Sequence, residues 1–141
     1  MLRQIFIFKL FVIFSICYAG EHYREIDQLK TKAIKGYSVY REIQDAEGMI
    51  VIFDGYPNGR STNEEAARSL FEWTKIPKLA YRHDWVSIVV PYGNNLYMDA
   101  EFFEMFQICI REALKKFNVK DGKYIVGGFS AGGSMAVGFA E

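Results

Sequence analysis

The stretch Gly128-Phe129-Ser130-Ala131-Gly132-Gly133 is the most informative part of this sequence, because it has the pattern Gly-x-Ser-x-Gly in a strand–turn–helix setting. Residues 123–127 before it read Lys-Tyr-Ile-Val-Gly and are typical of a β-strand. Residues 134–140 after it are small and apolar, which suits a helix packed tightly on a sheet. A serine at so sharp a turn needs a strained backbone and small neighbours. Its hydroxyl then stands clear of the sheet, near helix N-terminal amides that favour a developing negative charge.

Strand-like and helix-like segments alternate through the rest of the chain. Strands are expected at 36–43, 49–53 and 85–90, in addition to 123–127, and 49–53 is a continuous apolar run typical of a strand buried on both faces. A capping box at Ser61 or Thr62 predicts a helix that Pro77 ends or kinks. The polar segment 21–35 is expected to be a short helix or a loose arm. This order predicts an α/β fold, with a mostly parallel sheet flanked by helices.

A second, longer helix is expected from Asp99, which can cap it. Its apolar residues are spaced three or four apart, as a buried stripe requires; they are Phe102, Phe103, Phe106, Cys109, Ile110, Ala113, Leu114 and Phe117. Active residues of parallel α/β sheets gather at the carboxyl ends of the strands. Three loops are expected there, at 54–60, at 91–98 and at Ser130.

The first nineteen residues have the features of a signal peptide, with cleavage after Ala19. A positive charge at Arg3 precedes a mainly apolar run from Ile5 to Ile16, which is too short to span a bilayer comfortably. A lipid anchor at Cys17 and an uncleaved N-terminal anchor are the alternatives. The sequence therefore predicts an exported protein, secreted or periplasmic, with one domain at 20–141 and no stable membrane span after cleavage.

Composition restricts the possible partners. The chain has 141 residues, 50% of them hydrophobic, and no net charge, so nothing in its composition suggests the basic face that nucleic-acid binding needs. Aromatic residues make up 16% of it, which fits either a large aromatic core or an aromatic-lined acyl or sugar pocket. His22 and His83 are its two histidines, and no Cys/His cluster has metal-ligand spacing. Cys109 is expected to be a buried, inert thiol, and no metal or other cofactor is predicted.

With these residues in view, the segment from about Tyr37 to the end resembles the N-terminal half of the α/β-hydrolase superfamily, in its esterase and lipase-like branches. The resemblance implies that Ser130 is the nucleophile and that the backbone N–H of Ala131 helps to bind the oxyanion. It also implies a strand order in which 49–53 lies between 86–90 and 123–127. The alternative is a glycine-rich turn of another doubly wound fold, with Ser130 an ordinary turn residue.

The same resemblance points to the loop after 49–53 as the second half of the oxyanion hole. In the family this loop often begins His-Gly, whereas here Asp54 precedes Gly55. Pro57 has no N–H and cannot donate. Tyr56 is therefore the best candidate donor, through its amide or its hydroxyl, and Gly55 is the second. A tight surface loop without a binding role is the alternative.

One departure from the family is serious, since its acid and histidine follow the serine in the chain. Neither His83 nor His22 is expected to act as the base, and a serine without a base is a weak nucleophile. We therefore expect a secreted serine esterase represented by its N-terminal part, truncated and inactive as it stands. In the whole enzyme it would act on small-molecule esters or carbohydrate esters.

Two other functions stay open. A non-catalytic exported binding protein or pseudoenzyme would keep the fold without needing a base. A flavodoxin-like or Rossmann-like binding domain fits less well, because the first strand–helix loop lacks the pattern G-x-G-x-x-G.

Overall fold

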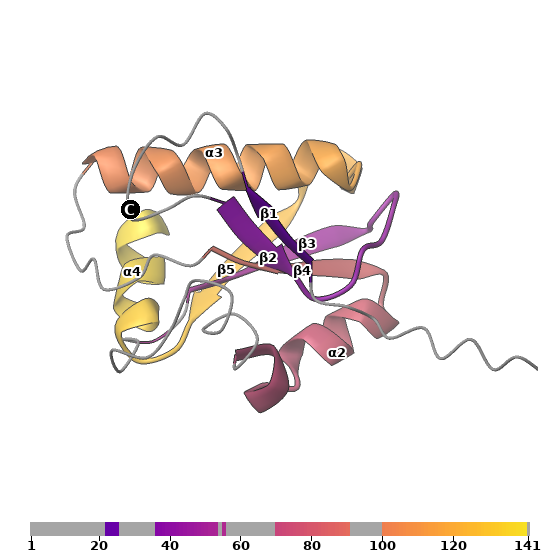
Figure 1. The fold of residues 1–141 in the computed structure, drawn as a ribbon, viewed down its shortest axis with the longest axis horizontal. Coiled ribbons are helices and arrows are strands. Elements are labelled where there is room, and N and C mark those ends of the chain that lie inside the picture. Colours follow the sequence, from indigo (N-terminus) through magenta and orange to yellow (C-terminus); the bar gives the residue numbers. More distant parts are fainter. Residues whose placement is uncertain (1–21, 26–35, 54, 56–69, 91–99, 141) are drawn as a thin grey trace, which may run out of the picture.

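The computed structural model describes residues 22–25, 36–53, 55, 70–90 and 100–140 (Figure 1). In chain order the elements are β1 (His22–Glu25), β2 (Gly36–Val39), β3 (Gly48–Phe53), α2 (Ile76–Arg82), β4 (Trp85–Val89), α3 (Ala100–Lys116), a 3-10 turn (Lys120–Gly122), β5 (Tyr124–Gly128) and α4 (Ala131–Ala140). The strands form one sheet in the order β1-β2-β4-β3-β5. Helices α3 and α4 cover one face of the sheet and α2 covers the other, so the fold is of the α/β class.

The parallel part of the sheet consists of β4, β3 and β5. Val51 at the middle of β3 is paired with Ile88 of β4 on one side and with Val126 of β5 on the other. The prediction that 49–53 lies between the other two parallel strands is thereby confirmed. All three strands end at one edge of the sheet, where ligands of parallel α/β sheets bind.

The sheet as a whole is mixed, and the expectation of a mostly parallel sheet is wrong outside β4, β3 and β5. Strand β2 runs antiparallel to β4, and β1 runs antiparallel to β2. Residues 40–47 are too few for the crossover that parallel strands need, so the chain reverses direction before β3. The described part of the polar segment 21–35 is strand β1, not a helix or a loose arm.

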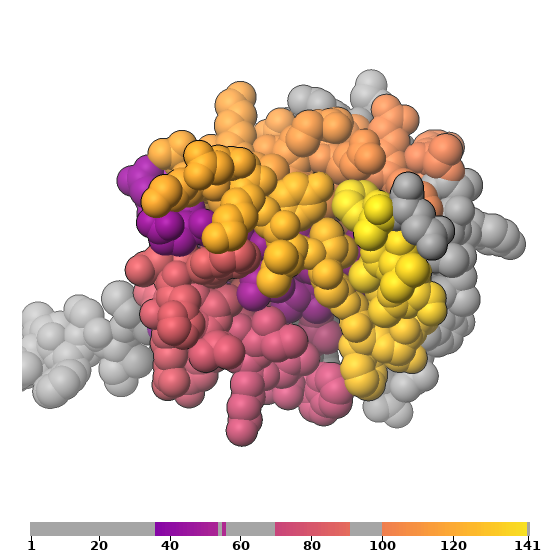
Figure 2. All heavy atoms as spheres, turned by 180° about the vertical axis from the view of Figure 1, so that it is seen from behind, coloured from indigo at the N-terminus to yellow at the C-terminus, as the bar shows by residue number. Residues whose placement is uncertain are grey.

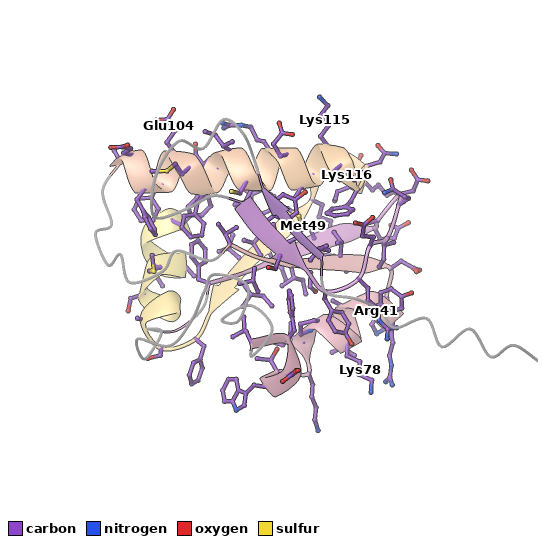
Figure 3. The ribbon with its side chains drawn as sticks, viewed as in Figure 1. Arg41, Met49, Lys78, Glu104, Lys115 and Lys116 are labelled. Carbon is purple, nitrogen blue, oxygen red and sulfur yellow. The ribbon has the colours of Figure 1, made fainter. Side chains whose placement is uncertain are left out.

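The main core lies between the sheet and the two helices α3 and α4. Phe53 of β3 stacks on Phe106 of α3, with ring centroids 4.4 Å apart. Met49 lies between the sheet and α3, whereas Glu104 and Lys115 project from the outer side of that helix (Figure 3). The predicted stripe is confirmed as buried at Phe102, Phe106, Cys109, Ile110, Ala113 and Phe117. Each such large side chain stabilises the fold by roughly 1.5–3 kcal/mol.

Pro77 begins a helix rather than ending one. Residues 70–73 are helical, and the amide of Thr74 still donates to the carbonyl oxygen of Leu70. The chain then leaves the helix, and α2 starts with Pro77 in its first turn. A proline is accepted there because the first-turn amides have no partner within the helix. The sequence did not predict α2, and the predicted caps Ser61, Thr62 and Asp99 lie outside the described residues.

Trp85 covers a glycine on the neighbouring strand. Gly48 is paired with Trp85, and a β-carbon on Gly48 would lie 2.6 Å from the indole ring. The ammonium of Lys123 lies over the ring of Trp85, 4.9 Å from its centroid. The indole of β4 therefore contacts Gly48 of β3 and Lys123, the residue just before β5, at the amino end of the parallel sheet.

Candidate functional site

The turn between β5 and α4 holds Ser130 in a left-handed backbone conformation, with φ of +53°. Among the described residues, the other non-glycine residues with positive φ are Asp45, Asp84, Asn118 and Asp121. Aspartate and asparagine visit this region readily because their short side chains bond to the nearby backbone. A serine has no comparable reason to adopt it. The turn, not the residue's own preference, therefore imposes the conformation on Ser130.

The glycine at position 128 makes the turn sterically possible. A β-carbon on Gly128 would lie 2.0 Å from the carbonyl oxygen of Gly132, so the end of β5 and the first turn of α4 are in backbone contact. The amide of Gly132 donates to Phe129 O, and the amide of Gly133 donates to Ser130 O, each at 2.9 Å. The chain thus passes from strand to helix within a single tight turn. This is the backbone arrangement that the Gly-x-Ser-x-Gly pattern predicts.

Ser130 is solvent-exposed and lies at the carboxyl end of the parallel strands, at the N-terminus of α4. The first turn of α4 contains no acidic residue, so its positive dipole end is not neutralised there. The amides of Gly132 and Gly133 already bond within the turn. Ala131, the predicted oxyanion donor, is the residue between the serine and these two amides.

Gly55 lies directly against the serine turn. It is buried, and a β-carbon added to it would be 3.4 Å from Phe129 O and 3.6 Å from the Ser130 β-carbon. The amide of Phe129 also donates to the carbonyl oxygen of Phe53, at 3.3 Å, which fastens the end of β3 to the turn. The structure therefore brings together the two chain segments that the sequence assigned to one site. Asp54, Tyr56 and Pro57 lie outside the described residues.

Neither histidine is placed to act on Ser130. His83 ends α2 and precedes β4, whereas Ser130 follows the end of β5, so the two are at opposite edges of the parallel sheet. Five strand residues separate those edges by roughly 16 Å. His22 belongs to β1, which is four strand positions from β5, a distance of about 19 Å. This geometry agrees with the expectation that neither histidine is the base.

An exposed aromatic pair adjoins the serine turn, and the sequence did not predict it. The rings of Trp73 and Phe129 meet edge to face, with centroids 4.6 Å apart. Trp73 is 64% exposed and Phe129 is 51% exposed. The ring of Phe129 also approaches Gly55, at 3.5 Å from the position of an added β-carbon. Trp73 and Phe129 are far apart in the sequence, so no local sequence pattern predicts their contact.

Cys109 is buried in the core, as predicted. Its Sγ lies 3.7 Å from the carbonyl oxygen of Gly36, and burial raises the pKa of the thiol to about 12. A thiol with so high a pKa is protonated at neutral pH and is a poor nucleophile. Within the described ranges, no three His, Cys, Asp or Glu side chains are grouped so that they could hold a metal ion.

In the part of the chain that the structure describes, no helix has the length and apolar character needed to cross a membrane. No protein-family model, curated protein or solved structure matches this chain. The α/β-hydrolase resemblance of the Gly-x-Ser-x-Gly stretch therefore stays a prediction, and the function is argued from the site itself.

Proposed function

We propose that this chain is the nucleophile-bearing part of an exported serine hydrolase of the esterase type, with Ser130 as the nucleophile. The left-handed conformation of Ser130 at the β5–α4 turn is the observation that carries the proposal. Enzymes often hold reacting groups in strained backbone conformations. Ser130 has such a conformation, and its exposed hydroxyl lies beside the N-terminus of a helix, where a negative charge is stabilised. The contact of Gly55 with the same turn supports a nearby oxyanion loop.

In the proposed reaction, the hydroxyl oxygen of Ser130 attacks the carbonyl carbon of an ester. A histidine of the longer protein, encoded downstream of Glu141, accepts the hydroxyl proton and then passes it to the departing alcohol. The tetrahedral oxyanion accepts hydrogen bonds from the amide of Ala131 and from Tyr56 or Gly55. Water then hydrolyses the acyl-enzyme, which restores the serine. The reaction requires no cofactor, and its substrates are small-molecule esters or carbohydrate esters.

A fluorophosphonate label and a short acyl-ester assay test this proposal. We expect the 141-residue chain to show neither labelling nor turnover, because neither of its histidines reaches Ser130. The same chain extended by the coding sequence downstream of Glu141 should hydrolyse the ester. In that longer protein Ser130→Ala should remove turnover, whereas Ser134→Ala, at another exposed serine of the same turn region, should retain it. An active Ser130→Ala variant would refute the assignment.

The positions of the two histidines also favour a second function, that of a non-catalytic exported binding protein with the same fold. It predicts that no in-frame acid and histidine follow Glu141 in the gene. It also predicts that Ser130→Ala changes no binding or catalytic property of the protein. Sequencing the downstream coding region separates the two functions directly.

A further inference from the structure

The aromatic pair Trp73 and Phe129 lies where ligands of parallel α/β sheets bind. Leu70 and Phe71, in the same helical segment as Trp73, pack against the carboxyl ends of β3 and β4. Phe129 directly follows β5, the third parallel strand. The two rings touch, so the helical segment 70–73 and the turn into α4 lie side by side at the surface (Figure 2). The pair is thus at the carboxyl edge of the parallel strands, which is the edge that binds ligands.

The ring of Phe129 has a defined position next to Ser130. A β-carbon added to Gly55 would lie 3.5 Å from Cδ1 of Phe129 and 3.6 Å from Cβ of Ser130. Because each atom lies within 3.6 Å of one point, the two are at most about 7 Å apart. The amide of Phe129 donates to the carbonyl oxygen of Phe53, and its ring contacts that of Trp73. These contacts hold the ring close to the serine side chain.

The two rings form an open aromatic corner, which consists of Trp73 and Phe129. Their planes are inclined at 62°, and each residue is more than half exposed. A flat group that enters the corner can therefore contact both rings at once. Neighbouring apolar side chains that stay exposed at a ligand-binding edge are a feature of binding sites, since an aromatic side chain gains free energy from burial.

The chemistry of the aromatic corner favours an aromatic group over a sugar or an alkyl group. A sugar needs hydrogen-bond partners for its hydroxyl groups, and the two rings offer only the indole N–H of Trp73. A third aromatic ring can pack edge to face or offset against the pair, which increases affinity beyond the effect of the buried area. A saturated ring of the same size buries a similar area without this gain.

We propose that the aromatic corner binds the aryl group of an ester whose carbonyl group lies at Ser130. The substrates are then esters with an aromatic ring close to the carbonyl carbon. At roughly 1.5 Å per bond, a ring joined to that carbon directly or through one or two atoms reaches Phe129. The inference rests on the proposed esterase function for the role of Ser130, whereas binding of an aryl group by the two rings requires no catalysis.

Ligand-observed NMR with the 141-residue chain tests the aryl site without catalysis. The probes are methyl phenylacetate and benzyl acetate, which carry the ring on the acyl side and on the alcohol side of the ester. Each is compared with its cyclohexyl analogue, which has the same number of heavy atoms. At least one of the two aryl esters should bind about 2- to 10-fold more tightly than its analogue.

Two variants assign this preference to the aromatic corner. Trp73→Leu and Phe129→Leu should each abolish it, because leucine stays apolar but has no ring. Tyr124→Leu is the matched control and should keep the preference, since Tyr124 is 40% exposed at the amino end of β5, away from the serine turn. Far-ultraviolet circular dichroism checks folding, and the Trp73→Leu variant should fold because Trp73 is largely exposed.

Equal binding of the aryl esters and their cyclohexyl analogues would overturn the proposal, as would a preference that survives Trp73→Leu or that Tyr124→Leu also removes. Turnover by the longer protein separates this inference from the proposed function. Hydrolysis that depends on Ser130 but shows the same kcat/KM for aryl and cyclohexyl esters would refute the aryl site and leave the esterase function standing. Selective aryl binding without such hydrolysis would support the aryl site and refute the esterase function.

Discussion

The carbonyl oxygen of Gly132 lies 2.0 Å from the place that a β-carbon on Gly128 would occupy. No side chain of any size fits between the end of β5 and the first turn of α4. This contact, and not the chemistry of the serine, fixes the geometry of the turn. Ser130 is held in a left-handed conformation because both of its flanking elements are already in place.

Gly128→Ala should destabilise the protein by at least about 2 kcal/mol, because the added methyl group meets backbone that cannot move aside. Gly127→Ala is the matched control one residue earlier, where the space is open. It should stabilise the fold by about 0.5 kcal/mol through a lower unfolded-state entropy. Urea unfolding of dilute protein measures both changes, and equal effects of the two substitutions would contradict the steric argument.

Ser130→Gly should raise the free energy of unfolding by about 0.5–1 kcal/mol, because glycine removes the strain of a left-handed residue at a modest entropic cost. Ser130→Ala should be nearly neutral, since alanine keeps the β-carbon and the strain. Both are measured by urea unfolding at neutral pH. A Ser130→Gly protein less stable than the Ser130→Ala protein would show that the hydroxyl, and not relief of strain, dominates this position.

Gly48→Ala should cost about 1–2 kcal/mol, because its methyl group would displace the indole of Trp85 and disturb the contact of that ring with Lys123. In a Trp85→Ala background the same change should be close to neutral. A double-mutant cycle of thermal or urea unfolding gives the coupling between the two residues. Additive effects of the two substitutions would mean that the ring does not cover Gly48 in solution.

Cys109 should make the protein less stable at alkaline pH. Burial raises the pKa of its thiol from an ordinary 9.0 to about 12, so the folded state holds the proton more tightly than the unfolded state. The stabilisation is complete below pH 9 and decreases as the pH rises toward 12. Between pH 9 and pH 12, the free energy of unfolding should depend less on pH in the Cys109→Ala variant than in the original chain. An identical pH dependence in both proteins would contradict the burial of the thiol.

Several helices and strands could be predicted from the sequence because the spacing and type of residues close together in the chain determine them. The apolar spacing from Phe102 to Phe117 forms a helix with one buried face, and the run 49–53 forms a strand covered on both sides. The Gly-x-Ser-x-Gly stretch likewise predicts a strand–turn–helix, since its small residues permit one particular backbone contact. In these segments local preference and tertiary packing agree.

Other features were decided by tertiary structure. The sequence of β1 gave no strand signal, because its residues become a strand through pairing with β2. Pro77 looked like a helix end, but the first turn of α2 accommodates it. The contacts of Phe129 with Trp73 and Gly55 join segments distant in the chain, which no local pattern encodes. The sequence by itself thus determined the strained serine turn, whereas the folded sheet decided what surrounds it, because long-range pairing alone brings those segments together.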